Sequence, residues 1–254
     1  MTVFYPRFIS LSLLTVLLAL TWVSCASTPE DKYDSAKDLI RAGDKLQSEE
    51  NYLRAKNKYQ QVLEDYPDSK ERVRAQILVA DALYRGREYE EAKFNYQKFV
   101  ELYPVHPKVD RAYFYSAMAN FKMIDLAARD QTATRAAIEG FSEFIKRFPK
   151  SPYRKAAEAK KKESVRKLAK NVFIIGKFYY RNGSYLSAIN RLNKLLETWP
   201  DEDFNDEALF LVAESYFKEQ NYEKARSSYR HLLKRFPASQ FTIQARKKLR
   251  KFRR

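Results

Sequence analysis

The chain has 254 residues, of which 45% are apolar and 31% are charged, and its formal net charge is +16 at pH 7. Five glycines and nine prolines leave little material for hairpin turns, so the composition favours helix over sheet. One cysteine and two histidines exclude a disulfide framework within one chain and a zinc site with the usual Cys and His ligands.

The first predicted element is an apolar segment at the amino terminus. Arg7 precedes an apolar run from Phe8 to Val23, which is short for a bilayer span. A positive start, an apolar middle and small residues near a boundary are typical of a secretory signal peptide, which we assign to residues 1–24. The composition then changes abruptly to ASTPEDKYDSAKD, and we predict a flexible tether over residues 25–33.

Cys25, the one cysteine of the chain, falls at this boundary. The junction resembles a bacterial lipoprotein signal, in which the cysteine becomes the lipidated first residue of the mature protein. Ser24, Ala26 and Ser27 fit that pattern, whereas Trp22 stands where leucine is usual. The alternative is an uncleaved anchor or an ordinary signal peptide with an incidental cysteine. The resemblance implies a covalent lipid on Cys25, and Ala26 in place of aspartate implies the outer rather than the inner membrane.

The segment NYLRAKNKYQQVLEDYP (51–67) introduces a pattern that recurs along the chain. Each copy places apolar or aromatic residues, an alanine and a final proline at the same offsets. The full copies are Tyr52, Ala55, Tyr59, Val62, Leu63, Tyr66, Pro67; Tyr89, Ala92, Tyr96, Phe99, Val100, Tyr103, Pro104; Tyr185, Ala188, Leu192, Leu195, Leu196, Trp199, Pro200; and Tyr222, Ala225, Tyr229, Leu232, Leu233, Phe236, Pro237. A weaker copy has Thr134, Ala137, Phe141, Phe144, Ile145, Phe148 and Pro149. The recurrence indicates packing positions rather than a ligand-holding tyrosine motif.

A second helical pattern precedes the full copies. A small residue lies nine positions before the leading aromatic residue, and a bulky one follows three positions later: Gly43 and Leu46, Ala80 and Leu83, Gly176 and Tyr179, Ala213 and Tyr216. Small residues against large ones let two helices approach closely, and the proline ends the second helix. This arrangement resembles the tetratricopeptide repeat. We therefore predict an all-α fold, a superhelical array of five tetratricopeptide-like helix pairs.

The spacing of the prolines locates the irregular parts of the array. Pro67 to Pro104 spans 37 residues, against about 34 in the usual repeat, so the extra residues should lie in the turn between repeats. Pro104 to Pro149 spans 45, which indicates an insertion around MIDLAARDQTAT (123–134). Pro149 to Pro200 spans 51, which leaves room for a long helix over about residues 152–181. We predict repeats one to three over 34–149, the long helix with repeats four and five over 150–247, and a basic tail over 248–254.

Three segments point to one family. They are YPVHPKVDRAYFYSAMANF (103–121), RDQTATRAAIEGFSEFIKRFPKSPY (129–153) and GKFYYRNGSYLSAINRL (176–192). Together they resemble the BamD family, outer-membrane lipoproteins of the β-barrel assembly machinery that are made of five tetratricopeptide repeats. The resemblance covers nearly the whole chain after Cys25. The RDQT segment and the A-x-N-R run from Ala188 to Arg191 are much more specific than a match to a repeat.

The resemblance implies a scaffold and no enzyme. It implies a lipid-tethered protein of the outer membrane, facing the periplasm, that binds BamA and other Bam lipoproteins and helps present unfolded outer-membrane β-barrel proteins. No cofactor is expected besides the lipid. The residues agree, because no constellation of nucleophile, base and orienting group stands out, and the settings of His106 and His231 favour exposed or packing roles.

The resemblance also implies two binding surfaces. Arg191 lies in the motif on the BamA-docking side, where its guanidinium could pair with a carboxylate of BamA; an intramolecular pair on the helix surface is the alternative. The first helices of repeats one and two should line a groove for an unfolded substrate, the alternative being a solvated groove without special affinity. The groove positions in this repeat type are Lys37, Ile40, Asp44, Arg74, Ile77, Asp81, Tyr84 and Arg85.

Two basic stretches, residues 153–170 and 246–254, hold 15 of the 48 Lys and Arg residues. They could form a solvated helix face and a frayed tail, or they could attract anionic phospholipid headgroups. Contacts to nucleic acid are disfavoured, because a secreted chain leaves the cytoplasm. A different repeat lipoprotein, such as a secretin pilotin or a cell-envelope coordinator, is the main alternative function, and the RDQT and A-x-N-R segments argue against it.

Overall fold

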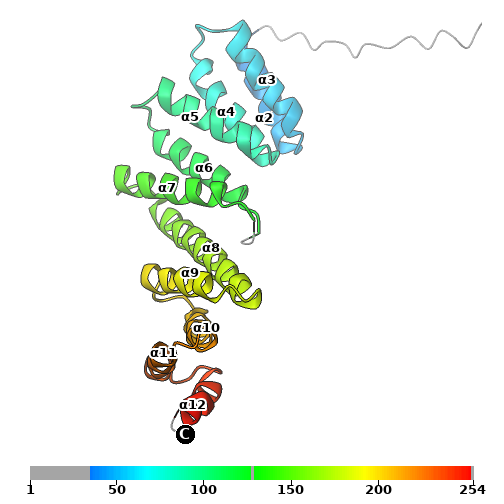
Figure 1. The fold of residues 1–254 in the computed structure, drawn as a ribbon. Coiled ribbons are helices and arrows are strands. Elements are labelled where there is room, and N and C mark those ends of the chain that lie inside the picture. Colours follow the sequence, from blue (N-terminus) through cyan, green and yellow to red (C-terminus); the bar gives the residue numbers. More distant parts are fainter. Residues whose placement is uncertain (1–34, 127–128, 253–254) are drawn as a thin grey trace, which may run out of the picture. The chain divides into compact units, whose positions relative to one another are not determined.

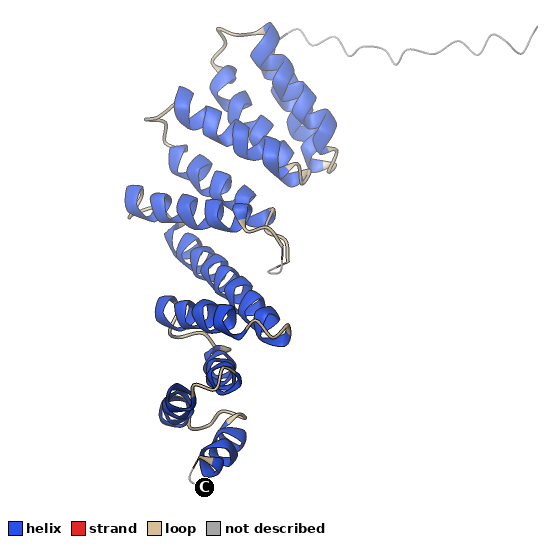
Figure 2. Cartoon of the chain, viewed as in Figure 1, coloured by secondary structure: helices blue, strands red, loops and turns tan. Residues whose placement is uncertain are grey.

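The computed structural model describes residues 35–126 and 129–252, and this part of the chain contains eleven helices and no strand (Figures 1 and 2). The predicted signal peptide, Cys25 and the tether lie outside the described residues. Residues 36–254 form one compact unit. The helices are α2 (Ala36–Ser48), α3 (Tyr52–Asp65), α4 (Glu71–Arg85), α5 (Tyr89–Leu102), α6 (Val109–Lys122), α7 (Thr132–Arg147), α8 (Arg154–Arg181), α9 (Tyr185–Thr198), α10 (Asn205–Lys218), α11 (Tyr222–Arg235) and α12 (Thr242–Lys251).

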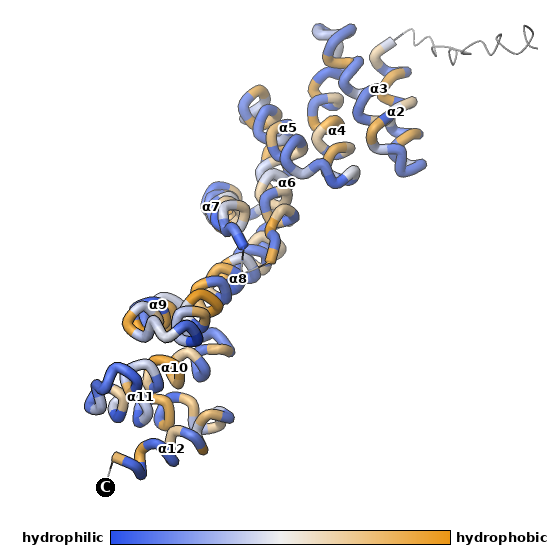
Figure 3. The backbone as a smooth tube through the Cα atoms, turned by 45° about the vertical axis from the view of Figure 1, so that its right-hand side comes forward, coloured by the Kyte–Doolittle hydropathy of each residue, from blue (hydrophilic) through white to orange (hydrophobic). Residues whose placement is uncertain are grey.

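The helices pack in the order in which they follow each other in the chain. Each one contacts the next, which gives the pairs α2–α3, α4–α5, α6–α7, α8–α9 and α10–α11, with α12 packed on α11. First helices of neighbouring pairs also meet, as α2 meets α4 and α8 meets α10. Hydrophobic and hydrophilic residues alternate along each helix (Figure 3), as expected when one stripe packs and the other faces solvent. The predicted all-α array of helix pairs is confirmed.

Small residues on the first helix of a pair receive a large side chain from the second. A Cβ atom added to Gly43 would lie 2.7 Å from Cδ1 of Tyr59, and one added to Gly176 would lie 2.7 Å from Cγ of Leu192. The five alanines of the second helices, Ala55, Ala92, Ala137, Ala188 and Ala225, are completely buried. The small and large columns of the sequence are therefore the interlocking surfaces of the pairs, as predicted.

Every second helix ends in the same way. The aromatic residue before each proline is the C-cap, and its N–H donates to the carbonyl four residues earlier; these caps are Tyr66, Tyr103, Phe148, Trp199 and Phe236. The next residue is proline, which has no N–H to continue the ladder. The turns between repeats that follow hold the residues beyond the usual repeat length.

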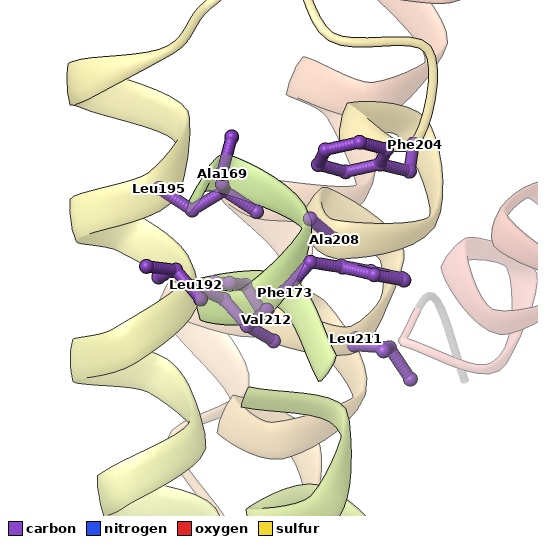
Figure 4. Packing of buried hydrophobic residues seen from close by; sticks show 9 residues of the cluster. Ala169, Phe173, Leu192, Leu195, Phe204, Ala208, Leu211 and Val212 are labelled. Carbon is purple, nitrogen blue, oxygen red and sulfur yellow. The ribbon is translucent and has the colours of Figure 1, made fainter. Parts of the chain in front are cut away.

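The long helix α8 joins two hydrophobic cores. Its amino-terminal half packs with α6 and α7, where Ala157 lies among Phe114, Phe141 and Phe144. Its carboxyl-terminal half packs with α9 and α10, and Figure 4 shows Phe173, Leu192 and Val212 converging there. The predicted length of this helix is confirmed, and one continuous helix thus links the third repeat to the last two.

Two expectations at irregular sites can be compared with the structure. Residues 123–126 and 129–131, which precede α7, are not helical, which agrees with the predicted insertion. The basic tail expected from residue 248 begins instead inside α12. Leu249 and Phe252 pack against the core of α10 and α11, and Lys248 pairs with Glu214. Burial of these side chains extends the folded repeats beyond the predicted boundary.

The tight turn within a pair requires left-handed backbone. Glu50, Arg87 and Gln220 have φ of 59°, 68° and 57°, and at the equivalent place the fourth pair has Gly183 with φ of 79°. Side chains with a Cβ adopt this region at a steric cost, which glycine avoids. The fourth pair therefore has the least strained turn of these four.

We expect Gly183→Ala to lower the free energy of unfolding by about 1 kcal/mol, because alanine is strained at positive φ. No atom lies within 4 Å of the added Cβ, so a steric clash would not contribute. Arg87→Gly should act in the opposite direction. Urea unfolding followed by circular dichroism measures both changes, and equal stability of the Gly183 variant and the parent would contradict this account of the turn.

Candidate functional site

The predicted groove residues lie on α2 and α4, and their carboxylates connect neighbouring repeats. Oδ1 of Asp44 accepts a hydrogen bond from the Tyr59 hydroxyl at 2.9 Å, and Oδ2 accepts one from Arg74 Nη2 at 2.5 Å. Tyr59 belongs to the same pair as Asp44, whereas Arg74 belongs to the next one. One carboxylate thus holds the second helix of its own pair and the first helix of its neighbour.

The same connection recurs one repeat later and is more enclosed. Oδ1 of Asp81 accepts from the Tyr96 hydroxyl and from Arg111 Nη2, both at 2.7 Å. The side chains of Asp81 and Arg111 are 11% and 25% exposed, against 39% and 57% for Asp44 and Arg74. The second connection should therefore contribute more to stability, because water screens it less.

The last pair repeats this arrangement with different residues. Glu214 accepts from the Tyr229 hydroxyl and also pairs with Lys248 of α12 at 2.7 Å. Between the fourth and fifth pairs the ion pair has the opposite polarity. Lys177 of α8 occupies the position that Asp44 and Asp81 occupy in the first two pairs, and it pairs with Glu207 of α10. The four ion pairs show that this column of the first helices serves contacts between repeats.

Burial and the neighbouring carboxylate raise the pKa of Tyr59, Tyr96 and Tyr229 above the ordinary value of tyrosine. Each phenol therefore remains a protonated donor through the neutral range. Because these pKa values are raised in the folded state, the stability that they contribute is complete below the ordinary tyrosine pKa and is lost as the pH rises above it. These three tyrosines are structural donors.

The structure separates the eight predicted groove residues into three groups. Ile40 and Ile77 are 2% exposed and lie in the core, so the prediction that they face a groove is corrected. The physical reason is that they lie on the side of α2 and α4 that packs against other helices. Asp44, Asp81 and Arg74 are already paired within the chain. Lys37 and Arg85 are exposed and Tyr84 is half-buried, so these three remain for a ligand.

Tyr84 belongs to a group of rings that we call the tyrosine cluster, defined as Tyr84, Tyr89, Tyr96 and Tyr115. Tyr84 lies 5.4 Å from Tyr89 and 5.2 Å from Tyr115 between ring centroids, and Tyr115 stacks on Tyr96 at 5.8 Å. Burial, with smaller contributions from Tyr89 and Tyr115, raises the pKa of Tyr84 to about 12. Tyr84, Tyr89 and Tyr115 are each only half-buried, so part of the cluster is accessible.

The sequence pattern did not predict that Arg111 and Tyr115 of the third repeat lie next to the groove residues of the second repeat. The guanidinium carbon of Arg111 lies 4.9 Å from the centroid of the Tyr115 ring, so this arginine carries both the ion pair with Asp81 and a cation–π contact. A signal was present, since Arg111 follows Pro104 by seven residues, as Arg74 follows Pro67. Tyr115 could not be assigned to the cluster from its spacing alone.

Arg191 lies on α9 and is half-buried. Its Nε atom is enclosed and has no hydrogen-bond partner, and the guanidinium makes no ion pair within residues 35–126 and 129–252. The intramolecular pair considered as an alternative is therefore not formed in the described chain. The same helix pair exposes two large apolar side chains, Phe178 on α8 and Leu186 on α9.

A hollow of about 770 Å³ lies between α3 and α5 with α4 as its floor. Leu63 and Val79 line it, and the exposed ring of Phe94 stands at its edge. Gln76, also in its lining, is buried, and its Nε2 has no hydrogen-bond partner. The sequence did not indicate this hollow, because Phe94 lies outside the repeated template.

No helix among the described residues is both long and apolar enough to cross a membrane. Within the same residues, His, Cys, Asp and Glu side chains form no group of three or more that could hold a metal ion.

We expect Asp81→Ala to lower the free energy of unfolding by roughly 3–5 kcal/mol, because it leaves Tyr96 and the largely buried Arg111 without their acceptor. Asp44→Ala is the matched control. It also removes the acceptor of the buried Tyr59 hydroxyl, but its ion-pair partner Arg74 is well exposed and stays hydrated, so it should cost only about 1–2 kcal/mol. Denaturant unfolding of both variants measures the difference. Equal losses of unfolding free energy in the two variants would show that the burial of the ion pair does not determine its contribution.

Two solved structures illustrate the similarity of this chain to known folds. The complex of the TPR2AB domain of yeast Sti1 with pHSP90 gives a TM-score of 0.44 at 15% identity and covers 84% of this chain and 81% of that one. The crystal structure of MamA gives 0.34 at 18% identity and covers 78% and 90%.

Comparison with protein families gives a match along most of the chain. The family model YfiO, described as outer membrane lipoprotein, matches residues 32–228. The outer membrane protein assembly factor BamD of Neisseria gonorrhoeae is 29% identical over 251 residues, which cover 92% of this chain and 94% of the relative. BamD of Haemophilus influenzae is 27% identical over 220 residues, covering 82% and 83%. This chain belongs to the YfiO/BamD family of outer membrane lipoproteins.

Proposed function

We propose that this protein is an assembly factor for outer-membrane β-barrel proteins, a scaffold that binds BamA and presents unfolded barrel proteins for insertion. The observation that carries this proposal is the correspondence with BamD relatives over more than nine-tenths of the chain. An array of helix pairs suits the role, because it offers extended surfaces to partners. In three of the helix pairs a tyrosine hydroxyl donates to a carboxylate that also pairs with a cation, and these contacts join helices.

The proposal includes a lipid anchor on Cys25. The cysteine follows the predicted signal peptide and precedes the first described helix, which begins with Ala36. An acyl-modified cysteine there would hold the helix pairs at the membrane surface through a short tether. The helix pairs would then face the periplasm, next to other Bam lipoproteins. No cofactor besides this lipid is part of the proposal.

We place the docking surface for BamA on the pair α8–α9. A half-buried guanidinium with an enclosed, unpartnered Nε has lost part of its hydration without gaining an acceptor. A carboxylate of BamA would give this otherwise unpaired guanidinium an acceptor, and arginine can bind a carboxylate through two hydrogen bonds. The exposed Phe178 and Leu186 of the same pair would add apolar contact area.

Arg191→Glu should reduce the amount of BamA that co-purifies with the lipidated protein by on the order of tenfold or more, because two carboxylates would then face each other. Lys194→Glu is the matched control, since Lys194 is exposed on the same helix and the charge change is identical. Quantitative immunoblotting of BamA measures recovery, and circular dichroism verifies that both variants keep their helical content. Equal recovery of BamA with both variants would reject this role for Arg191.

We place the surface for unfolded barrel proteins on α2 and α4, at the exposed cations Lys37 and Arg85 and at Tyr84 of the tyrosine cluster. Arg85, an exposed cation that follows the half-buried ring of Tyr84 in α4, suits an extended segment that carries aromatic side chains and a negative charge. The other predicted groove charges are occupied by contacts between repeats. The substrate would therefore bind at the edge of the column of ion pairs on the first helices, and not at the paired charges themselves.

A photoreactive phenylalanine analogue at Tyr84 should capture an unfolded barrel protein. The matched control is the same analogue at Phe94, an exposed aromatic position outside the predicted groove. Gel electrophoresis of the crosslinked products compares the two sites. Stronger labelling at Phe94 would move the substrate to the hollow between α3 and α5, and no labelling at either site would contradict substrate binding by the first two repeats.

A further inference from the structure

The positive charge of this chain is concentrated at its carboxyl end. Residues 224–254 contain 12 Lys and Arg residues and no Asp or Glu, whereas residues 1–223 contain 36 Lys and Arg against 32 Asp and Glu. Three-quarters of the net charge of +16 is therefore carried by the last 31 residues. The described part of this segment forms α11 and α12, the last two helices of the array, which are in contact with each other. Figure 3 shows hydrophilic stretches along both.

Helix α12 is fixed by its inner face. Ala245 is completely buried, and the ring of Phe252 lies 5.8 Å from Phe217 of α10 and 6.3 Å from Tyr229 of α11. Lys248 points toward the same side and pairs with the buried Glu214. The helix is therefore a folded cap on the last repeat, and its remaining cations point outward from a rigid support.

Those outward cations have no acidic partner. Arg246 and Arg250 lie one turn apart on α12, as do Lys247 and Lys251, and all four are exposed. Arg230 and Lys234 are arranged in the same way on α11. None of the six makes an ion pair with any described residue. We call this set the C-terminal basic surface.

Stabilisation of the helix does not account for this surface. A cation in the last turn interacts favourably with the helix dipole, but the effect falls off within that turn, and like charges at adjacent turns repel each other. Arg246 and Lys247 lie before the last turn, and α11 repeats the arrangement. Ile243, at the start of the same stripe, is 77% exposed. Cations beside an exposed aliphatic side chain are typical of helices that lie on a membrane surface.

We propose that the C-terminal basic surface docks on anionic phospholipid headgroups. This inference rests on the proposed function for the presence of a membrane, but it concerns a contact that is separate from the lipid anchor. Six flexible cations on two helices match a diffuse layer of negative charge better than one carboxylate cluster of a folded protein. Ile243 would enter the headgroup region. Anchor and basic surface together would give the protein two separate membrane contacts, one at each end of the chain.

The test uses the chain from Ala26 onward, which lacks Cys25 and hence the lipid but retains the complete folded unit of residues 36–254. Binding is measured by co-sedimentation with vesicles of phosphatidylethanolamine and phosphatidylglycerol in equal amounts, and with vesicles of phosphatidylcholine. We expect binding to the anionic vesicles only, weakened by added salt. Replacing Arg246, Lys247, Arg250 and Lys251 by glutamine should reduce it by on the order of a hundredfold or more.

The matched control replaces Lys98, Lys122, Lys155 and Lys162 by glutamine. These four lysines are exposed, lie on α5, α6 and α8, and make no ion pair with a described residue. The control has the same net charge as the test variant, so it should retain most of the binding. Equal losses in both variants would overturn the proposal, because the overall charge and not the C-terminal surface would then be responsible. Unchanged binding of the test variant would overturn it as well.

A second readout follows the surface directly. In the chain from Ala26 onward, which has no cysteine, Ile243→Cys supplies a single thiol. An environment-sensitive dye attached there should shift to the blue on anionic vesicles, whereas the same dye at Val105→Cys should not. A variant that loses a co-purifying acidic protein but still binds vesicles would overturn the lipid proposal in favour of a protein partner. Recovery of BamA by the lipidated glutamine variant separates the two ideas, because loss of vesicle binding with normal recovery of BamA leaves the proposed function intact.

Discussion

Close contact between the two helices of each pair is the constraint on which the remaining structure depends. At Gly43 and Gly176 the first helix has no side chain, and the ring of Tyr59 or the isobutyl group of Leu192 fills that place. The completely buried alanines of the second helices allow the same approach from the other side. These contacts fix the second helix of each pair against the first. The aromatic cap and the proline that follow therefore end every second helix in the same way, before the chain continues to the next helix.

Contacts between pairs depend in turn on that geometry. Once Tyr59, Tyr96 and Tyr229 are packed, their hydroxyl groups meet a carboxylate on the first helix, and the carboxylate binds a cation of the next helix. The ion pair of opposite polarity, Lys177 with Glu207, stands at the end of the long helix α8, where the stacking of repeats is otherwise provided by a shared hydrophobic core. Asp44, Arg74 and Asp81, which were predicted from the sequence to line a ligand groove, therefore stabilise the contact between neighbouring repeats.

Function is left to the groups that these contacts do not use. Tyr84 and Arg85 lie at the edge of the column of ion pairs, and Arg191 keeps an unpartnered nitrogen on the fourth pair. The six cations of the C-terminal basic surface are exposed and make no ion pair with a described residue. The three surfaces differ in chemistry, since one combines rings and cations, one is a single guanidinium near apolar side chains, and one is a broad positive area. The proposed role as a scaffold for several different partners would require such separate surfaces on one array of helix pairs.

The sequence by itself determined the helix pairs, their turns and the family, because small, large and proline positions recur at fixed offsets and packing within a pair is local in the chain. It also located the long helix, whereas the role of Arg191 stays a prediction. Only the tertiary structure decided which polar groups are free. Ile40 and Ile77 are enclosed by other helices, Asp81 finds Arg111 thirty residues away, and Lys248 belongs to a packed helix instead of a tail. The physical reason is that burial and pairing depend on the neighbouring repeat, whose side chains no single repeat specifies.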